Sequence, residues 1–172
     1  MLTGFMATGK SAVGRRLASR LGYDFIDVDD LIEAKAGMAI PEIFTSRGEA
    51  AFRELETRMV EVAAGRVGCV IATGGGAIVD PRNFEALRRS GVIVTLTADP
   101  DTILSRIGAG ADRPLLEGGE KRERIRNLLA ARAAAYARAH LTVDTSKRTV
   151  DEVVDALVSL LRSHQVTAVE GT

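Results

Sequence analysis

Residues that mark several large classes of protein are scarce in this chain of 172 residues. Cys69 is the single cysteine, so no disulfide can form within the chain, and we expect a reducing, cytoplasmic location. No apolar run approaches the roughly 18 residues that a membrane helix needs, so we expect no membrane partner. Residues 1–4 do not resemble a signal peptide, because no charged segment precedes a long apolar one.

Neither sign of charge dominates. The chain has 23 basic and 23 acidic residues, whereas a general binder of nucleic acid would show a basic excess, so we expect no nucleic-acid partner. Lysine is rare, with 4 residues against 19 arginines. Arginine grips carboxylates and phosphates with paired N–H groups, although genomic base composition would also explain the excess.

The rest of the composition, 46% hydrophobic and 27% charged, is that of a globular protein with a sizeable core. Apolar runs predict five strands, near residues 2–4, 23–27, 69–73, 92–97 and 141–144. Amphipathic patterns and start signals predict helices over residues 10–21, 29–36, 41–47, 49–64, 81–91, 121–138 and 149–161, and another from residue 100. We expect a loose tail after Arg162. Strands that alternate with helices predict an α/β fold, a five-stranded parallel sheet flanked by helices, in one domain over residues 1–172.

The strongest local motif runs from Gly4 to Ser11 and fits G-x-x-x-x-G-K-[ST] at every fixed position. Glycines let backbone N–H groups turn toward phosphate oxygens, and the helix that begins at Lys10 directs its positive end at the same anion. Lys10 would neutralise phosphate charge and Ser11 would bind Mg²⁺. Only three residues precede Gly4, so either the first strand is short or the natural chain begins upstream.

A pair of acids ends the second predicted strand. Asp27 and Asp29 would share a side if the segment is extended, beside the phosphate loop at the carboxyl edge of the sheet. One acid could hold hydrated Mg²⁺, and the other could orient or deprotonate an acceptor hydroxyl. Alternatively, Asp29 or Asp30 caps the next helix.

An ordered set of motifs extends this interpretation over residues 4 to about 160. The set comprises the phosphate loop, Phe25-x-Asp27-x-Asp29-x-x-Ile32-Glu33, Ile40-x-Glu42-Ile43-Phe44-x-x-x-Gly48-Glu49-x-x-Phe52-Arg53-x-x-Glu56, Gly74-Gly75-Gly76, Arg113-Pro114-Leu115, and Arg132 with Tyr136. In this order the motifs resemble shikimate kinase. The resemblance implies a P-loop, nucleoside-monophosphate-kinase-like fold, with a substrate-binding insertion at about 29–60 and a lid loop at about 108–119. It also implies a monomer that transfers the γ-phosphoryl group of ATP to the 3-hydroxyl of shikimate. The products would be shikimate 3-phosphate and ADP, in the route to chorismate and the aromatic amino acids.

The resemblance also implies a role for each matching residue. The ATP-binding residues would be Gly9, Lys10, Ser11, Ala12, Val13, Gly14, Arg106, Arg113 and Arg148, with Arg106 and Arg148 against adenine. The shikimate-binding residues would be Asp29, Arg53, Gly75 and Arg132. The metal-binding residues would be Ser11 and Asp27, and the catalytic residues Lys10, Asp29 and Arg113, with Asp29 as the candidate base.

Several alternatives stay open. Arg53 alone could be a solvated helix charge, and Phe44 and Phe52 are expected in the core. Gluconate kinase shares this fold but has no reason to hold Arg53, Arg132 and three glycines together. A non-catalytic binding module would be expected to lose phosphate-loop residues. The chain also departs from the family where Ala7-Thr8-Gly9-Lys10 replaces Gly-Ala-Gly-Lys and where no proline lies between Arg132 and Tyr136.

Overall fold

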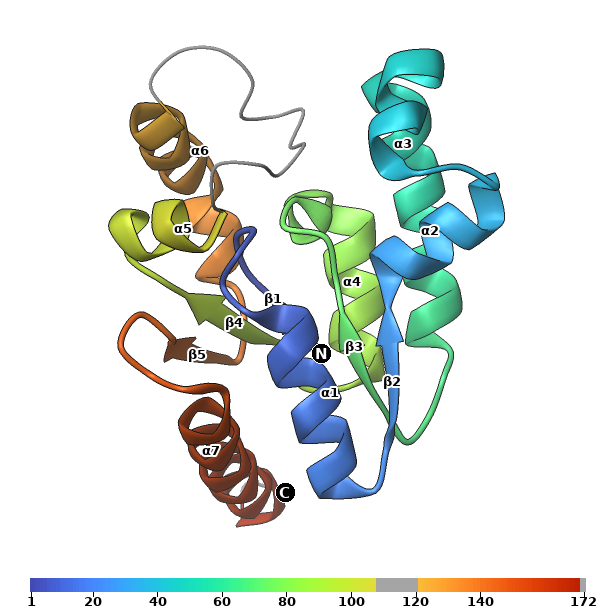
Figure 1. Ribbon diagram of the computed structural model, residues 1–172. Helices are drawn as coiled ribbons and strands as arrows, with labels where there is room; N and C mark the ends of the chain where they lie inside the picture. Colours follow the sequence, from blue (N-terminus) through green and yellow to red (C-terminus); the bar gives the residue numbers. More distant parts are fainter. Residues whose placement is uncertain (108–120, 171–172) are drawn as a thin grey trace.

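A computed structural model gives the fold and describes residues 1–107 and 121–170, with side chains through residue 164. Its strands form one sheet in the order β2-β3-β1-β4-β5, and every neighbouring pair is parallel (Figure 1). The strands are β1 (Leu2–Thr3), β2 (Asp24–Asp27), β3 (Cys69–Ala72), β4 (Val94–Thr97) and β5 (Leu141–Asp144). The predicted α/β fold with a five-stranded parallel sheet is confirmed.

The shortest strand, β1, lies in the middle of the sheet. Leu2 is in register with Ala72 of β3 and with Val94 of β4. Further backbone hydrogen bonds extend the pairing on both sides, from Val94 N to Met1 O (2.8 Å) and from Thr73 N to Leu2 O (3.1 Å). The loop that follows β1 is therefore held between the carboxyl ends of two strands, where parallel sheets bind ligands.

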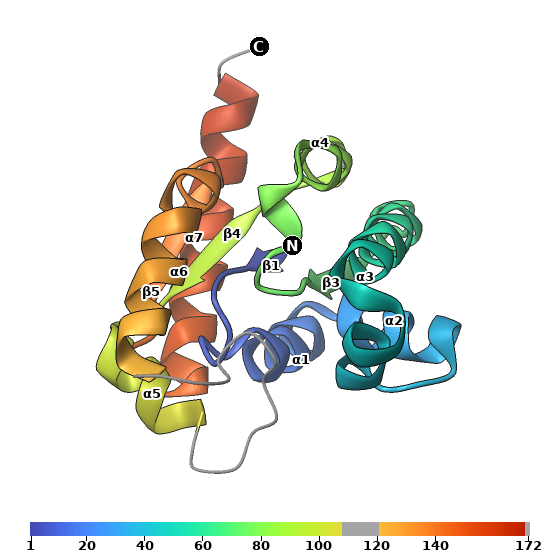
Figure 2. The same ribbon diagram turned by 90° about the horizontal axis from the view of Figure 1, so that it is seen from above.

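Helices cover both faces of the sheet. They are α1 (Lys10–Leu21), α2 (Val28–Ala36), α3 (Ile40–Ala64), the 3₁₀ helix η1 (Ala77–Val79), α4 (Pro81–Ser90), α5 (Pro100–Ile107), α6 (Lys121–Tyr136) and α7 (Val150–Glu170). Val70 packs into a buried cluster with Leu17 of α1 and Leu157 of α7, whereas its neighbour Ile71 belongs to a second cluster with Leu87 of α4. This alternation is the period of a strand, and Figure 2 shows α1 and α4 on opposite sides of β1.

Local capping explains where several helices begin. The Asp80 carboxylate accepts a hydrogen bond from Arg82 N at the start of α4, which also has a proline in its first turn. At the start of α7, Thr149 N donates to Glu152 Oε2 (2.7 Å) and Glu152 N donates to Thr149 Oγ1 (3.3 Å). Both starts were predicted from the sequence and are confirmed.

Helices α2 and α7 differ from the sequence prediction in ways that matter below. Helix α2 begins at Val28, one residue earlier than predicted, so Asp27 and Asp29 do not lie on one extended segment. Helix α7 runs to Glu170, so the loose tail expected after Arg162 is wrong. Once a helix has started, each added residue gains a hydrogen bond at little cost in free energy. The helix therefore continues, because neither glycine nor proline occurs between Arg162 and Gly171. Within the described part of the chain, no helix has the length and apolarity that crossing a membrane requires.

Candidate active site

The phosphate loop joins β1 to α1. Gly9 is the N-cap of α1, with φ of 93°, and its carbonyl accepts a hydrogen bond from Val13 N (2.8 Å). The Lys10 side chain folds back over the loop, because its Nζ donates to the carbonyls of Gly4 (2.9 Å) and Phe5 (2.8 Å). The loop thus presents a helix N-terminus and an ammonium group together, which is the arrangement that binds phosphate.

The backbone of the loop is tightly held. Gly4 has φ of 131°, and a Cβ on it would lie 2.1 Å from the carbonyl oxygen of Leu96 in β4, so no other residue fits without displacement of the strand. Thr8 is buried and donates through Oγ1 to Phe5 O (2.8 Å). Ala7 adopts φ of 60°, a left-handed conformation that glycine adopts more easily.

Two acids and a hydroxyl meet beside this loop. Ser11 Oγ donates to Asp27 Oδ2 (2.6 Å), and Asp29 N donates to Asp27 Oδ1 (3.2 Å). Asp27 therefore caps α2 and also binds the serine of the phosphate loop. The alternative that Asp29 or Asp30 caps the helix is wrong, because the helix begins at Val28 and Asp27 is its cap, which leaves the Asp29 carboxylate to other contacts.

A cavity of about 290 Å³ opens next to the loop. It is lined by one residue of the loop, by residues of α2 and α3, by the glycine turn after β3, and by α6: Met6, Asp29, Glu33, Ile40, Pro41, Phe44, Phe52, Arg53, Glu56, Gly74, Gly75, Gly76 and Arg132. Figure 1 shows these elements around the same end of the sheet. The cavity is bounded by two guanidinium groups and three carboxylates, which suits a small ligand that carries both a negative charge and hydroxyl groups.

Helix α3 supplies one guanidinium and holds it in place. Arg53 Nη1 donates to Glu56 Oε2 (2.8 Å), and Arg53 Nη2 donates to Glu49 Oε1 (3.1 Å). Glu56 is 1% exposed, and its other oxygen, Oε1, is buried without a hydrogen-bond partner among the described residues. Burial raises the pKa of Glu56, and the adjacent Arg53 opposes that rise.

Gly74, Gly75 and Gly76 form the turn between β3 and η1. A Cβ on Gly74 would lie 2.7 Å from Glu56 Oε1, and one on Gly76 would lie 3.0 Å from Arg53 Nη1. A larger residue at either position would displace the charged groups of the cavity. The glycines are therefore needed for the close approach of the Glu56 and Arg53 side chains to the turn.

The two arginines expected against adenine lie on the other side of the phosphate loop. Arg106 of α5 donates to Ala7 O (3.3 Å), to Thr145 Oγ1 (3.0 Å) and to Thr145 O (2.7 Å). Thr145, just after β5, in turn donates to Thr8 O (3.1 Å). Arg148 is exposed in the same turn, where its N–H donates to Thr145 O (3.4 Å). Arg106 thus ties α5 and the turn after β5 to the loop.

The family model described as "Shikimate kinase" matches residues 6–162, which is most of the chain. The chain belongs to the shikimate kinase family. Two curated relatives agree with this. The shikimate kinase of Geobacter sulfurreducens is 48% identical over 96% of this chain and 91% of its own length. That of Thermus thermophilus is 46% identical over 95% of this chain and 89% of its own.

Solved structures show the same relationship. A shikimate kinase from Acinetobacter baumannii, in complex with shikimate, superposes with a TM-score of 0.91 at 37% identity and covers 95% of this chain and 92% of its own. A gluconokinase from Sinorhizobium meliloti 1021 shares the fold at a TM-score of 0.58 and 19% identity. The sequence prediction of a shikimate kinase, an ATP-dependent enzyme with a nucleoside-monophosphate-kinase-like fold, is confirmed over the gluconate kinase alternative.

The structure brings together most of the residues that the resemblance to shikimate kinases singled out. Those on the acceptor side line one cavity: Asp29, Arg53, Gly75 and Arg132. Those on the donor side lie on or beside the phosphate loop and the start of α1: Gly9, Lys10, Ser11, Ala12, Val13, Gly14, Asp27 and Arg106. Arg113 and the lid expected at 108–119 lie outside the described residues.

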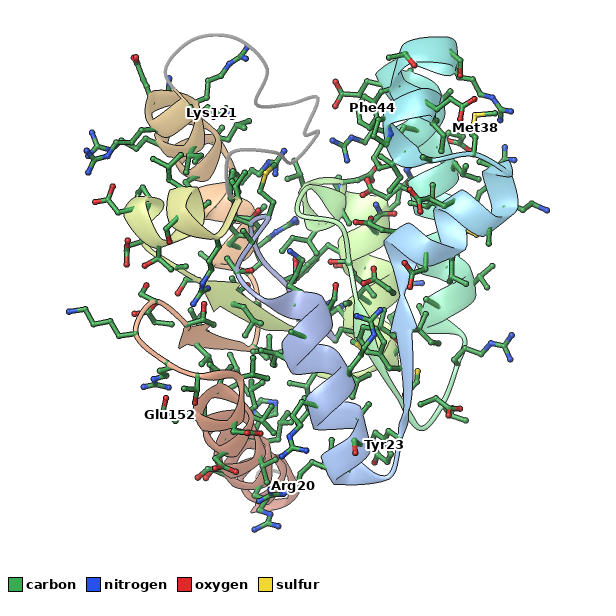
Figure 3. The ribbon with its side chains drawn as sticks, viewed as in Figure 1. Arg20, Tyr23, Met38, Phe44, Lys121 and Glu152 are labelled. Atoms are coloured by element: carbon green, nitrogen blue, oxygen red, sulfur yellow. The ribbon has the colours of Figure 1, made fainter. Side chains whose placement is uncertain are left out.

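Sequence reasoning missed two aromatic residues that line the cavity. Phe44 and Phe52, expected only in the core, both line the cavity, with ring centroids 4.6 Å apart. Phe52 is 5% exposed, so it serves core and cavity together. Figure 3 shows Phe44 at the upper end of α3, facing the space between α3 and α6. Helical spacing could place both rings on one face but could not show that this face borders a cavity. The anchoring role of Thr145 had no signal in the sequence.

Proposed function

We propose that the cavity binds shikimate and the phosphate loop binds ATP, so that this shikimate kinase transfers the γ-phosphoryl group across their border. The observation that supports this most strongly is the approach of the glycine turn to the loop. A Cβ on Gly75 would lie 3.3 Å from both Gly4 O and Met6 N. Gly75 therefore contacts the phosphate loop and also lines the acceptor cavity.

On the acceptor side, Arg53 and Arg132 bind the carboxylate of shikimate. A carboxylate accepts paired N–H bonds from guanidinium groups in a geometry that lysine cannot offer. Asp29, on α2, accepts from the ring hydroxyls and takes the proton of the attacking hydroxyl, because it lines the cavity close to the phosphate loop. The aromatic rings of Phe44 and Phe52 supply an apolar wall for the ring carbons.

On the donor side, Lys10 moves its ammonium from the carbonyls of Gly4 and Phe5 to the terminal phosphates. The backbone amides of the phosphate loop and of the first turn of α1 surround the same phosphates, and Arg106 and Arg148 lie against adenine. Catalysis in this class of reaction comes mainly from positioning and from stabilisation of charge on the transferred group. We assign Arg113 to the stabilisation of charge on the transferred group, and the predicted lid at 108–119 to the exclusion of water.

Ser11 and Asp27 fit a Mg²⁺ ion. Their hydroxyl and carboxylate oxygens already meet at 2.6 Å, and magnesium prefers such oxygen ligands together with waters and substrate phosphates. The described residues contain no group of three or more His, Cys, Asp or Glu that could hold a metal ion. Ser11 and Asp27 would therefore hold Mg²⁺ jointly with ATP, and the ion would supply neutralisation of phosphate charge. We also propose that the enzyme acts as a cytoplasmic monomer.

An acceptor panel tests this function. Shikimate, gluconate and nucleoside monophosphates are each offered with ATP and Mg²⁺, and ADP release is followed. We expect ADP release with shikimate and with none of the other acceptors. In Arg53→Ala, loss of a charged hydrogen bond should raise the KM for shikimate by roughly 10- to 100-fold and leave the KM for ATP within about twofold. Turnover with another acceptor, or an Arg53→Ala effect mainly on ATP, would contradict the proposal.

A further inference from the structure

One carbonyl group in the glycine turn receives two side-chain donors from α6. The oxygen of Gly75 accepts from Arg132 Nη1 (3.2 Å) and from Tyr136 Oη (2.5 Å). The two donors are four residues apart and so share one face of α6, which has no proline between them. The missing proline therefore leaves a continuous helix that brings both side chains to one atom.

These bonds complete the anchoring of the turn. The carbonyls on either side are also held, because Gly74 O accepts from Ala77 N and Gly76 O accepts from Val79 N, both at 3.1 Å. In a trans peptide the N–H points opposite to the preceding carbonyl. The N–H groups of Gly75 and Gly76 therefore point away from η1 and α6, and both glycines line the acceptor cavity.

Arg132 has two competing tasks in this arrangement, if it binds the acceptor carboxylate as proposed above. Its Nη1 donates to Gly75 O, which fixes the orientation of the guanidinium, whereas paired binding of a carboxylate requires one edge of the guanidinium to face that ligand. Turning toward the carboxylate weakens the bond to Gly75. A carbonyl left without a donor in a partly buried turn costs free energy, which binding of the ligand would have to supply.

Tyr136 is built to keep that carbonyl satisfied. Its side chain is 8% exposed, and its own backbone oxygen accepts from Thr95 Oγ1 of β4 (3.0 Å), so the end of α6 is fixed to the sheet. Burial raises the pKa of Tyr136, although Arg132 opposes the shift, so the phenol keeps the proton that it donates. The bond to Gly75 O is also the shorter of the two.

We propose that Tyr136 is a positioning residue of the kinase reaction: its hydroxyl holds the Gly75 carbonyl and so releases Arg132 to bind the acceptor carboxylate. The inference rests on the proposed role of Arg132. Loss of the Tyr136 hydroxyl should therefore lower the affinity for the acceptor and leave the affinity for the nucleotide unchanged.

The chain offers a matched pair of variants, because it has two tyrosines. Tyr136→Phe removes the hydroxyl and keeps the ring, and Tyr23→Phe makes the same change at a 51% exposed side chain. Figure 3 shows Tyr23 at the foot of α1, far from Phe44. In Tyr136→Phe we expect the KM for shikimate to rise roughly three- to tenfold, from the loss of one hydrogen bond, with the KM for ATP within about twofold. Tyr23→Phe should change neither. Equal changes in both KM values, or no change in either, would overturn the proposal.

A second measurement does not need Tyr136→Phe to fold. In Tyr23→Phe, Tyr136 is the single fluorophore of its kind, because the chain has no tryptophan. Its emission should change as shikimate is added and the Arg132 guanidinium turns from Gly75 O toward the ligand. An unchanged signal, at shikimate concentrations that saturate turnover, would overturn the proposal.

The two proposals fail in different ways. If Arg132→Ala leaves the KM for shikimate unchanged, the proposed function of Arg132 is wrong. If Arg132→Ala raises that KM while Tyr136→Phe does not, the function stands and the role of Tyr136 is wrong.

Discussion

At the scale of single residues, the ion pair between Arg53 and Glu56 joins a buried carboxylate, which lowers stability, to a guanidinium that lines the cavity of this shikimate kinase. Glu56 is almost wholly buried, with one oxygen unpartnered among the described residues, and an isolated carboxylate in that position would destabilise the fold. The Glu56 carboxylate also fixes the Arg53 guanidinium at the wall of the cavity. Under the proposed function, Glu56 serves binding of the acceptor more than stability of the fold.

Glu56→Gln separates these two effects. Burial raises the pKa of Glu56 above its ordinary 4.5, so the folded state holds the proton more tightly than the unfolded state. The stability that this group contributes is present below pH 4.5 and is lost as the pH rises through the raised pKa. Glutamine does not titrate, so the Tm of Glu56→Gln relative to the wild type should increase from about pH 4.5 upward. The KM for shikimate should rise roughly tenfold, because Arg53 loses its charged partner.

Glu49→Gln is the control for that measurement. Glu49 contacts the same guanidinium, but its side chain is 57% exposed, and such exposed pairs contribute little. In Glu49→Gln, the KM for shikimate and the pH dependence of the Tm should both be close to those of the wild type. A fall in the relative Tm of Glu56→Gln with rising pH would contradict the argument.

Individual residues also mark the limit of what the sequence can predict. Lys10 and Ser11 could be assigned because a fixed spacing in the chain places them on one loop. Asp27 was assigned to the metal, but its capping of α2 could not be seen, because the exact first residue of a helix depends on competing local hydrogen bonds. Tyr136 contacts Gly75, a residue distant in sequence, and no local pattern records such a contact.

At the scale of elements, side-chain caps helped to predict where helices begin. Helix α7 illustrates this, since Thr149 and Glu152 close its first turn with reciprocal hydrogen bonds. Its end was predicted wrongly because termination needs a positive signal, and the chain supplies none before Gly171. The order of strands in the sheet could not be predicted from periodicity, because it depends on pairings between distant segments.

Thr149→Ala tests the cap of α7. The substitution removes the acceptor for Glu152 N and should cost about 1 kcal/mol, which lowers the Tm by roughly 2–4 °C in a protein of this size. Ser159→Ala, on the exposed side of the same helix, is the matched control and should leave the Tm nearly unchanged. Differential scanning calorimetry measures both. An equal loss in the two variants would show that the cap contributes nothing specific.

At the scale of the whole molecule, the donor and acceptor sites belong to one folded unit and their ligands should stabilise it separately. A ligand at 100 times its Kd adds about 2.7 kcal/mol to the free energy of unfolding, and thus roughly 5–10 °C to the Tm. We expect this rise with shikimate alone and with nucleotide and Mg²⁺ alone. In Lys10→Ala the rise with nucleotide should be largely lost and the rise with shikimate retained. Loss of both would show that Lys10 supports the fold and not the donor site in particular.

The break in α3 at Gly48 has a consequence for how such enzymes change. Gly48 has φ of 80° and ψ of 168°, so the turns that carry Pro41 and Phe44 are joined to those that carry Arg53 by a single non-helical residue. The segment before this joint lines the acceptor cavity, whereas the phosphate loop lies between β1 and α1. A lineage could therefore remodel acceptor preference by substitutions ahead of the joint while the nucleotide machinery is inherited intact. Kinases with different acceptors could diverge on this scaffold in that way.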